Sequence, residues 1–191
     1  AKRFGTEHHR IFVDSSRALP SLERCIKSMS EPMVSHDNIG FYLLSAEVSK
    51  HVKVVQSGPG ADEIFAGYHW YPPLMESNDA LTDYRRLFFD RDAKEYAEVM
   101  NPRFAGDADH ATRFVAEHFA QPGADTAVDK ALRLDSLVML VDDPVKRVDN
   151  MTMAWGLEAR VPFLDHELVE LAASIPPEFK LADNGKGVLK D

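Results

Sequence analysis

Cysteine is nearly absent from this chain of 191 residues, which contains only Cys25. A lone cysteine leaves no partner for an internal disulfide, and it is typical of a reducing compartment, so we expect the cytoplasm. Cys25 lies in the helical pattern 22–26, and we predict that it is a small, buried apolar residue.

Positive charge and long apolar runs are also scarce. There are 22 lysines and arginines against 31 acidic residues, giving a net charge of −9. This balance argues against nucleic acid as a partner, because phosphate binding needs clustered lysine and arginine. Apolar runs fall short of the roughly 20 residues of a membrane span, so we expect no membrane association. The apolar content of 45% is sufficient for a core.

The eight histidines do not form a set of metal ligands. His8 and His9 are adjacent, so their side chains would point to opposite faces of a strand. His166 lacks a second histidine at helical spacing. We therefore predict no transition-metal site.

The segment Ser57–Tyr68 is the most informative motif. It follows the apolar run Val52–Gln56, which predicts a buried strand. Gly58 and Gly60 allow positive φ angles and close approach of a ligand, and a following helix would offer free N–H groups to a phosphate. The alternative is an ordinary turn from strand to helix.

Two acidic residues begin the expected helix of this motif. Asp62 and Glu63 can hold Mg²⁺ beside a phosphate. They also fit a purely structural role, because acidic residues in a first turn complement the helix dipole and Asp62 can serve as an N-cap.

A second block, Arg147–His166, stands far along the chain and includes Gly-Leu-Glu-Ala-Arg-Val-Pro-Phe-Leu-Asp. Together with Ser57–Tyr68 it resembles the synthetase domain of glutamine-dependent asparagine synthetases. Both blocks stand in that family's order, with Pro176–Leu181 behind them. The resemblance extends from Gly5–His9 to Gly185–Lys190.

This resemblance implies an α/β fold of the adenine nucleotide alpha-hydrolase-like type. We expect a partial parallel sheet over residues 1–75, followed by an all-helical part over residues 76–191. The implied reaction uses ATP and Mg²⁺ to activate a small carboxylate as an acyl-adenylate. Ammonia from a glutaminase domain of the parent chain then forms the amide. A homodimer is an open alternative for its assembly.

The resemblance also assigns site residues. Those expected against the nucleotide are Ser57, Gly58, Gly60 and Glu63, and Asp62 is expected to bind Mg²⁺. Lys186 would stabilise the adenylate-forming transition state and the departing pyrophosphate; taken alone, it is an ordinary loop cation. Glu158 and Arg160 fit either a substrate pocket with a catalytic role or a structural ion pair, and Arg147 and Asp149 fit structural ion pairs.

The sequence departs from the family in three places. We find no Ser-Gly-Gly-x-Asp-Ser pyrophosphate loop and no N-terminal catalytic cysteine, so we expect a fragment that is inactive alone. Pro59 stands where the family usually has an acidic or polar residue, and proline cannot orient or deprotonate an amine. Free aspartate as the substrate is thereby placed in doubt.

Three alternatives remain at this stage. The segments Glu31–Asp37, Tyr71–Leu74 and Asp142–Arg147 look like a bacterial branch that amidates an acetylated glutamine dipeptide. A non-catalytic helical interaction module is the alternative from another class. β-Lactam formation on the same scaffold matches the blocks less closely.

Local patterns predict the following elements. Strands are expected at 9–14 and 52–56, in parallel, and helices at 20–29, 39–50, 79–89, 93–99 and 108–119. Val138, Val141, Val145 and Val148 form a stripe expected to face the core. Asp143 is expected to cap a new helix that has Pro144 at its first position, and Asp165 to cap another that stops before Pro176.

Overall fold

The structure is a computed structural model that describes residues 3–32, 35–106 and 109–190. The chain folds as two compact units. The strand unit comprises Ala1–Ser57 and Asp142–Pro162, and the helical unit comprises Gly58–Val141 and Phe163–Asp191. Within the described ranges, no helix has both the length and the apolar character needed to cross a bilayer.

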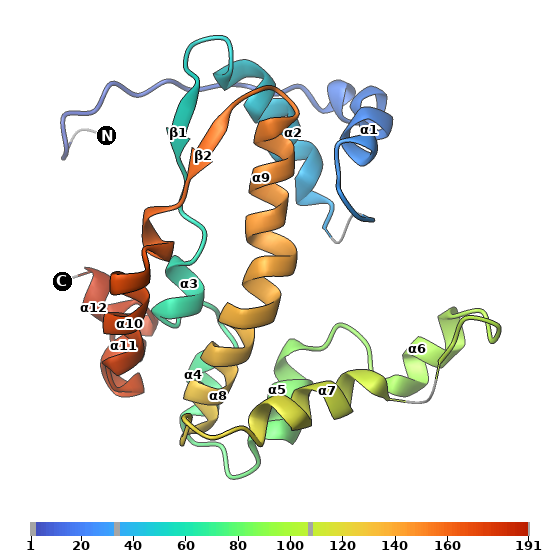
Figure 1. The fold of residues 1–191 in the computed structure, drawn as a ribbon, viewed down its shortest axis with the longest axis vertical. Coiled ribbons are helices and arrows are strands. Elements are labelled where there is room, and N and C mark those ends of the chain that lie inside the picture. The colour runs from blue at the N-terminus through green and yellow to red at the C-terminus, as the bar shows by residue number, and fades with distance from the viewer. Residues whose placement is uncertain (1–2, 33–34, 107–108, 191) are drawn as a thin grey trace. The chain divides into compact units, whose positions relative to one another are not determined.

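The strand unit holds a two-stranded parallel sheet. Strand β1 (Val54–Gln56) pairs with β2 (Glu158–Arg160), with Val54 opposite Glu158 and Gln56 opposite Arg160 (Figure 1). The helices of this unit are α1 (Ala18–Lys27), α2 (Asp37–Val48) and α9 (Lys146–Met153). Helix α2 packs against both α1 and α9.

Cys25 lies in the core of the strand unit with Tyr42, Leu43 and Met151. Its Sγ lies 3.4 Å from Sδ of Met151, and burial raises the pKa of its thiol. The prediction of a buried, apolar cysteine is therefore confirmed.

The α/β class is confirmed, but the pairing of the strands differs from our prediction. Residues 9–14 form neither helix nor strand, and Phe12 is 83% exposed. The partner of Val54–Gln56 is instead Glu158–Arg160, which lies in the half predicted to be all-helical. Alternating side chains predict an extended segment, but pairing depends on a partner that is distant in sequence and on cover for both faces.

The helical unit begins with two short helices, α3 (Ala61–Ile64) and α4 (Tyr71–Leu74). The longer helices that follow are α5 (Ala80–Phe88), α6 (Ala93–Val99), α7 (His110–Phe119) and α8 (Ala127–Leu134). The last three are α10 (His166–Ser174), α11 (Pro177–Leu181) and α12 (Gly187–Lys190). The helices predicted from 20, 39, 79, 93 and 108 are confirmed as α1, α2, α5, α6 and α7, although Ala108 lies outside the described residues.

Side-chain caps explain why these helices begin where they do. Asp79, Asp92, Asp109, Thr126 and Asp165 each accept a hydrogen bond from a backbone N–H in the first turn of the helix that follows. Such caps satisfy donors that have no partner inside the helix. The prediction for Asp165 is confirmed.

Asp135 organises the core of the helical unit. Its carboxylate is fully buried and accepts hydrogen bonds from the Tyr71 hydroxyl (2.7 Å), the Trp70 indole (3.0 Å) and the Tyr84 hydroxyl (2.5 Å). Burial raises the pKa of Asp135, while the three donors act in the opposite direction. Burial, reinforced by Asp135, also raises the pKa of Tyr71 and Tyr84.

The predicted valine stripe is wrong at one position. Val148 is buried and Val138 is partly buried, but Val141 is 52% exposed. The chain forms π-helical turns at Asp135–Met139 and Val141–Val145, so the helical phase shifts between these valines. A stripe counted at 3.6 residues per turn therefore misplaces Val141, which lies just beyond the first π-helical turn.

The predicted helix start at Asp143 is also wrong. Pro144 lies inside the second π-helical turn, where the absence of its N–H is accommodated. The carboxylate of Asp143 lies 3.1 Å from Arg147, which also contacts Asp37 at 3.4 Å. Arg147 thus belongs to a structural ion-pair group, whereas Asp149 forms no ion pair among the described residues.

Candidate functional site

The turn that connects β1 to α3 requires glycine at one position. Gly60 has a φ of 98°, and a Cβ there would lie 2.3 Å from Cδ2 of Leu164. Gly58 has neither a positive φ nor any atom near its Cβ position. The turn therefore depends on Gly60 for its shape, while Gly58 leaves open space beside the backbone.

Asp62 lies at the second position of α3 and forms an ion pair with Lys186. The Lys186 Nζ is 2.7 Å from the Asp62 Oδ1, and both side chains are about one-third exposed. The N-cap of α3 is Gly60, so the alternative role of Asp62 as a cap is wrong. Gly67 makes room for this carboxylate, because a Cβ at position 67 would lie 1.9 Å from Oδ1.

Backbone strain marks the place where the Lys186 loop meets the end of α3. Lys186 and Ala66 both have positive φ angles, of 55° and 57°. The Lys186 N–H donates to the Phe65 carbonyl at 3.1 Å, and a Cβ on Gly185 would lie 2.5 Å from the Ala66 carbonyl oxygen. Left-handed conformations of residues other than glycine persist where the surrounding structure enforces them, and they concentrate at functional sites.

Glu63 takes no part in this ion pair. Its side chain is buried, with 1% exposed, and it accepts a hydrogen bond from the Tyr68 hydroxyl at 2.7 Å. It also lines a cavity between α8, α10 and α11. The Glu63 side chain is thus buried beside Tyr68, whereas Asp62 is partly exposed and meets Lys186.

Ser57, Glu158 and Arg160 belong to the strand unit. The Ser57 N–H donates to the Arg160 carbonyl at 2.8 Å and so extends the pairing of β1 with β2. The Arg160 Nε lies 3.2 Å from Glu158 Oε1, with both side chains largely exposed. The structural ion pair that we weighed for these two residues is therefore present, and it joins the first and last residues of β2.

Asp62 is the carboxylate that the sequence predicts for a Mg²⁺ ion, and in the structure it meets Lys186. Among the described residues, no three His, Cys, Asp or Glu side chains form a metal-binding group. Mg²⁺ is commonly bound through one or two carboxylates together with phosphates and water. The ammonium of Lys186 on Asp62 shows that this carboxylate already attracts a cation.

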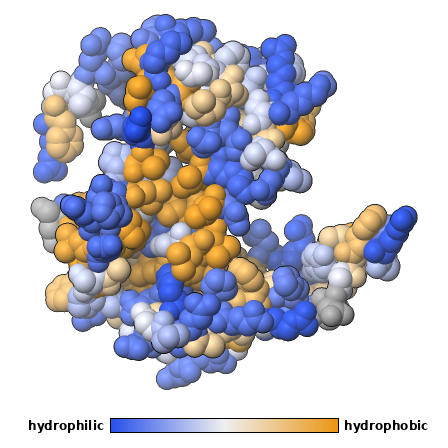
Figure 2. All heavy atoms as spheres, viewed as in Figure 1, coloured by the Kyte–Doolittle hydropathy of each residue, from blue (hydrophilic) through white to orange (hydrophobic). Residues whose placement is uncertain are grey.

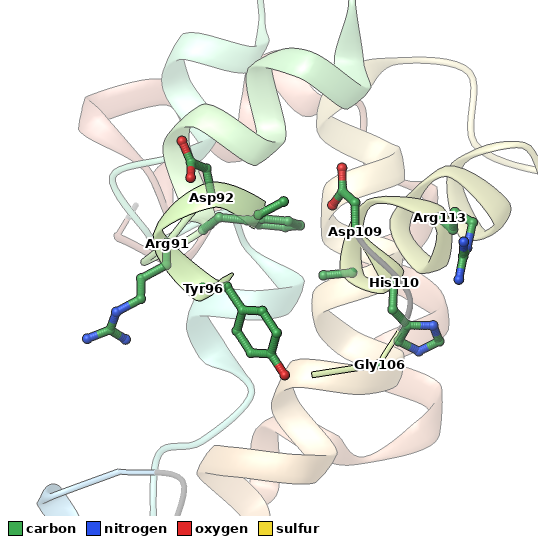
Figure 3. Close-up of a pocket in the computed structure, with 10 residues that line it drawn as sticks. Arg91, Asp92, Tyr96, Gly106, Asp109, His110 and Arg113 are labelled. Carbon is green, nitrogen blue, oxygen red and sulfur yellow. The ribbon is translucent and has the colours of Figure 1, made fainter. Parts of the chain in front are cut away.

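A cavity of about 580 Å³ lies elsewhere, between α6 and the start of α7. Tyr96 points into it, whereas the side chains of Arg91 and Arg113 extend away on opposite sides (Figure 3). Asp109 in its wall contacts Arg85 at 3.4 Å. None of the residues predicted for the site lines this cavity.

Comparison with known proteins agrees with the two motif blocks. The asparagine synthase family model matches residues 1–191. The chain belongs to the asparagine synthase family. It is 33% identical, over 98% of its length, to asparagine synthetase [glutamine-hydrolyzing] 3 of Bacillus subtilis strain 168, covering 31% of that protein. It is 27% identical to a putative asparagine synthetase of Mycobacterium tuberculosis H37Rv, over 95% of this chain and 33% of the relative.

A mammalian asparagine synthetase matches this chain with similar identity and coverage. The chain is 27% identical to the Rattus norvegicus asparagine synthetase over 97% of its own length and 25% of the relative. The chain therefore spans a third or less of the length of these curated relatives.

Sequence reasoning found Asp62 and Lys186 separately but missed the residues that bring them together. Gly67, Ala66 and Gly185 allow the two segments to approach. Gly67 stands inside the Ser57–Tyr68 block, and Gly185 stands directly before Lys186. These positions were the feature of the sequence that could have indicated the close approach. What each glycine avoids is visible only in the folded chain.

Proposed function

We propose that this chain forms the ATP-dependent, amide-forming part of a glutamine-hydrolysing synthetase. The observation that carries the proposal is the ion pair between Asp62 and Lys186. It joins residues 124 positions apart, one from the glycine-rich block and one from the C-terminal segment. Membership in the asparagine synthase family and the names of its relatives support this reaction class.

The proposed chemistry has two steps. An oxygen of the substrate carboxylate attacks the α-phosphorus of ATP, and the bond to pyrophosphate breaks. Ammonia then attacks the acyl carbon, AMP leaves, and the nitrogen loses a proton. Lys186 would stabilise the negative charge that moves onto pyrophosphate, while Mg²⁺ held by Asp62 would supply further charge neutralisation.

The ion pair between Asp62 and Lys186 is compatible with both proposed roles. Asp62 Oδ1 is occupied by the Lys186 ammonium at 2.7 Å. If Asp62 turns this oxygen to a metal ion, Lys186 loses its only ion-pair partner among the described residues and becomes available to phosphate. The positive φ of Lys186 and its N–H bond to the Phe65 carbonyl fix the backbone from which this side chain extends.

The other residues of the proposed site have supporting roles. Ser57, Gly58 and Gly60 would contact the nucleotide, with Glu63 supporting that turn from its buried position. Glu158 and Arg160 would act on the carboxylate substrate from strand β2. Pro59 favours a substrate other than free aspartate, because it cannot act on the attacking amine. An acetylated glutamine dipeptide is the second candidate.

A glutaminase domain is the proposed source of ammonia, and the cytoplasm is the proposed compartment. Exposed apolar residues of the helical unit support contact with another protein surface. They include Leu171, Phe179 and Leu189, which are 61%, 58% and 42% exposed. Figure 2 shows apolar residues, in orange, at the surface of the face in view. Exposed apolar surface is a common feature of interaction sites.

Replacing Lys186 with alanine tests the proposal. In the full-length protein, Lys186→Ala should lower kcat for amide synthesis by roughly 100-fold to 1,000-fold, as expected for loss of one transition-state donor. The KM for ATP should change little, because the contact forms mainly in the transition state. Steady-state assays of synthesis and of glutamine hydrolysis would measure both, and hydrolysis should persist.

Lys190→Ala is the matched control. Lys190 is an exposed lysine of the same segment, and its Nζ donates to the Asp183 carbonyl. This variant should synthesise amide at the normal rate. Near-normal synthesis by Lys186→Ala would overturn the assignment and leave Lys186 as a loop cation.

A further inference from the structure

A second cavity, of about 450 Å³, lies wholly within the helical unit. Its apolar wall is formed by Ile64, Leu132, Leu137, Val169, Ala173, Ile175, Pro176 and Pro177. Its volume falls in the range of small-molecule sites, which typically combine apolar walls with a few polar groups. The apolar wall is aliphatic, which suits an aliphatic rather than a flat aromatic ligand.

Lys180 supplies an unusual cation to this cavity. Its side chain is only 3% exposed and lines the cavity. Its amine makes no hydrogen bond or ion pair with the described residues. Burial lowers its pKa, which reflects the unfavourable removal of an ammonium group from water. A negatively charged ligand group would stabilise this ammonium, and the cavity gives such a ligand access to it.

Asp129 places an opposite charge near Lys180 without meeting it. Asp129 lines the same cavity, and its charge acts to raise the pKa of Lys180. Its Oδ2 accepts a hydrogen bond from the Thr126 hydroxyl at 2.7 Å. The pair has no N–O contact within 4.0 Å, although both residues are described. Their charged atoms therefore lie more than 4.0 Å apart, and both residues line the same cavity.

The remaining charged groups of the cavity favour a ligand that carries both a positive and a negative charge. The carboxylates of Glu63 and Asp125 add negative charge to the wall. Arg133 donates to the carbonyls of His118, Gln121 and Pro122 and is thereby committed to the end of α7. A simple anion would approach Lys180 against three carboxylates, whereas a zwitterion would satisfy both signs.

We propose that this cavity binds an α-amino acid with a branched aliphatic side chain. The ligand carboxylate meets Lys180, its ammonium group meets Asp129, and its side chain lies on the aliphatic wall. The two charges of an α-amino acid stand on one carbon, so a single molecule can bridge this pair. Neither Asp62 nor Lys186 lines this cavity, although Glu63, which has a supporting role in the proposed reaction site, lies in its wall.

Calorimetric titration with three probes tests the proposal on the 191-residue chain. L-Leucine carries both charges, 4-methylpentanoate lacks the ammonium group, and 3-methylbutylamine lacks the carboxylate. We expect leucine to bind, and each of the other probes to bind at least about tenfold more weakly, the equivalent of one good charged hydrogen bond. Equal binding of 4-methylpentanoate, or no binding of leucine up to about 10 mM, would overturn the proposal.

Two variants locate the site. Lys180→Met keeps the apolar stem and removes the charge, and Asp129→Asn removes the opposite charge; each should weaken leucine binding at least about tenfold. Lys94→Met, at an exposed lysine outside the cavity, should bind leucine normally. Because methionine suits a buried site, Lys180→Met should melt at or above the wild-type temperature. Unchanged leucine binding by a folded Lys180→Met variant would contradict the assignment.

Discussion

The two glycines of the Ser-Gly-Pro-Gly turn differ in how strongly the fold requires glycine at their positions. Gly60 combines a left-handed backbone with a close approach to Leu164, whereas Gly58 has neither constraint. We predict that Gly60→Ala lowers the free energy of unfolding by more than about 1 kcal/mol. Gly58→Ala should leave it nearly unchanged. Urea unfolding of both variants would measure the difference, and equal stability would contradict this view of the turn.

Asp62 is the residue at which metal binding can be tested. We predict that Asp62→Asn in the full-length protein raises the Mg²⁺ concentration needed for half-maximal synthesis, because it removes a charged oxygen ligand. Glutamine hydrolysis should be largely intact. A titration of activity with Mg²⁺ would show the shift.

Asp90→Asn provides the control for this experiment. Asp90 is exposed, and no hydrogen bond or ion pair of its side chain is present among the described residues. The Asp90→Asn variant loses one negative charge, as Asp62→Asn does, at a position outside the proposed site. An equal shift in both variants would mean that overall charge, not ligation by Asp62, sets the Mg²⁺ requirement.

At the level of elements, the π-helical turns decide which face of a helix is buried. Val148 is 3% exposed, whereas Val141 is 52% exposed after the shift in helical phase. We predict that Val148→Asp lowers the free energy of unfolding by at least roughly 2 kcal/mol, because it buries an unpaired charge. Val141→Asp should change it by no more than about 0.5 kcal/mol.

Thermal melts of these two variants would separate the alternatives. A large loss of stability in Val141→Asp would mean that the valines form one continuous buried stripe. A normal melting temperature for Val148→Asp would place that valine at the surface.

At the scale of the whole molecule, the tyrosine–aspartate core links stability to alkaline pH. Burial raises the pKa of Tyr71 and Tyr84 above the ordinary value of 10.0. Above about pH 10 the unfolded chain releases these protons while the folded chain retains them, so the unfolded state binds fewer protons. The resulting stabilisation is complete below pH 10 and is lost as the pH rises further.

We predict that the free energy of unfolding falls above pH 10 by up to about 1.4 kcal/mol per pH unit for each of these tyrosines. Urea unfolding between pH 8 and about pH 11 would measure the slope. Tyr71→Phe should reduce it, because one titrating group is removed. Stability that stays constant in this interval would contradict the burial of the two hydroxyl groups.

The sequence by itself determined most local features. Helix starts at Asp92 and Asp165 follow from short-range hydrogen bonds between a side chain and the backbone of the next turn. The two motif blocks also identified the family, since they depend only on residue order. The sequence singled out Asp62 and Lys186 separately, and the roles assigned to them stay predictions.

Only the tertiary structure decided how distant segments meet. It paired Val54–Gln56 with Glu158–Arg160 and joined Asp62 to Lys186. It also turned Val141 outward. The physical reason is the same in each case: periodicity and capping act over a few residues, whereas strand pairing, ion pairs and the phase of an irregular helix depend on packing between residues far apart in the chain.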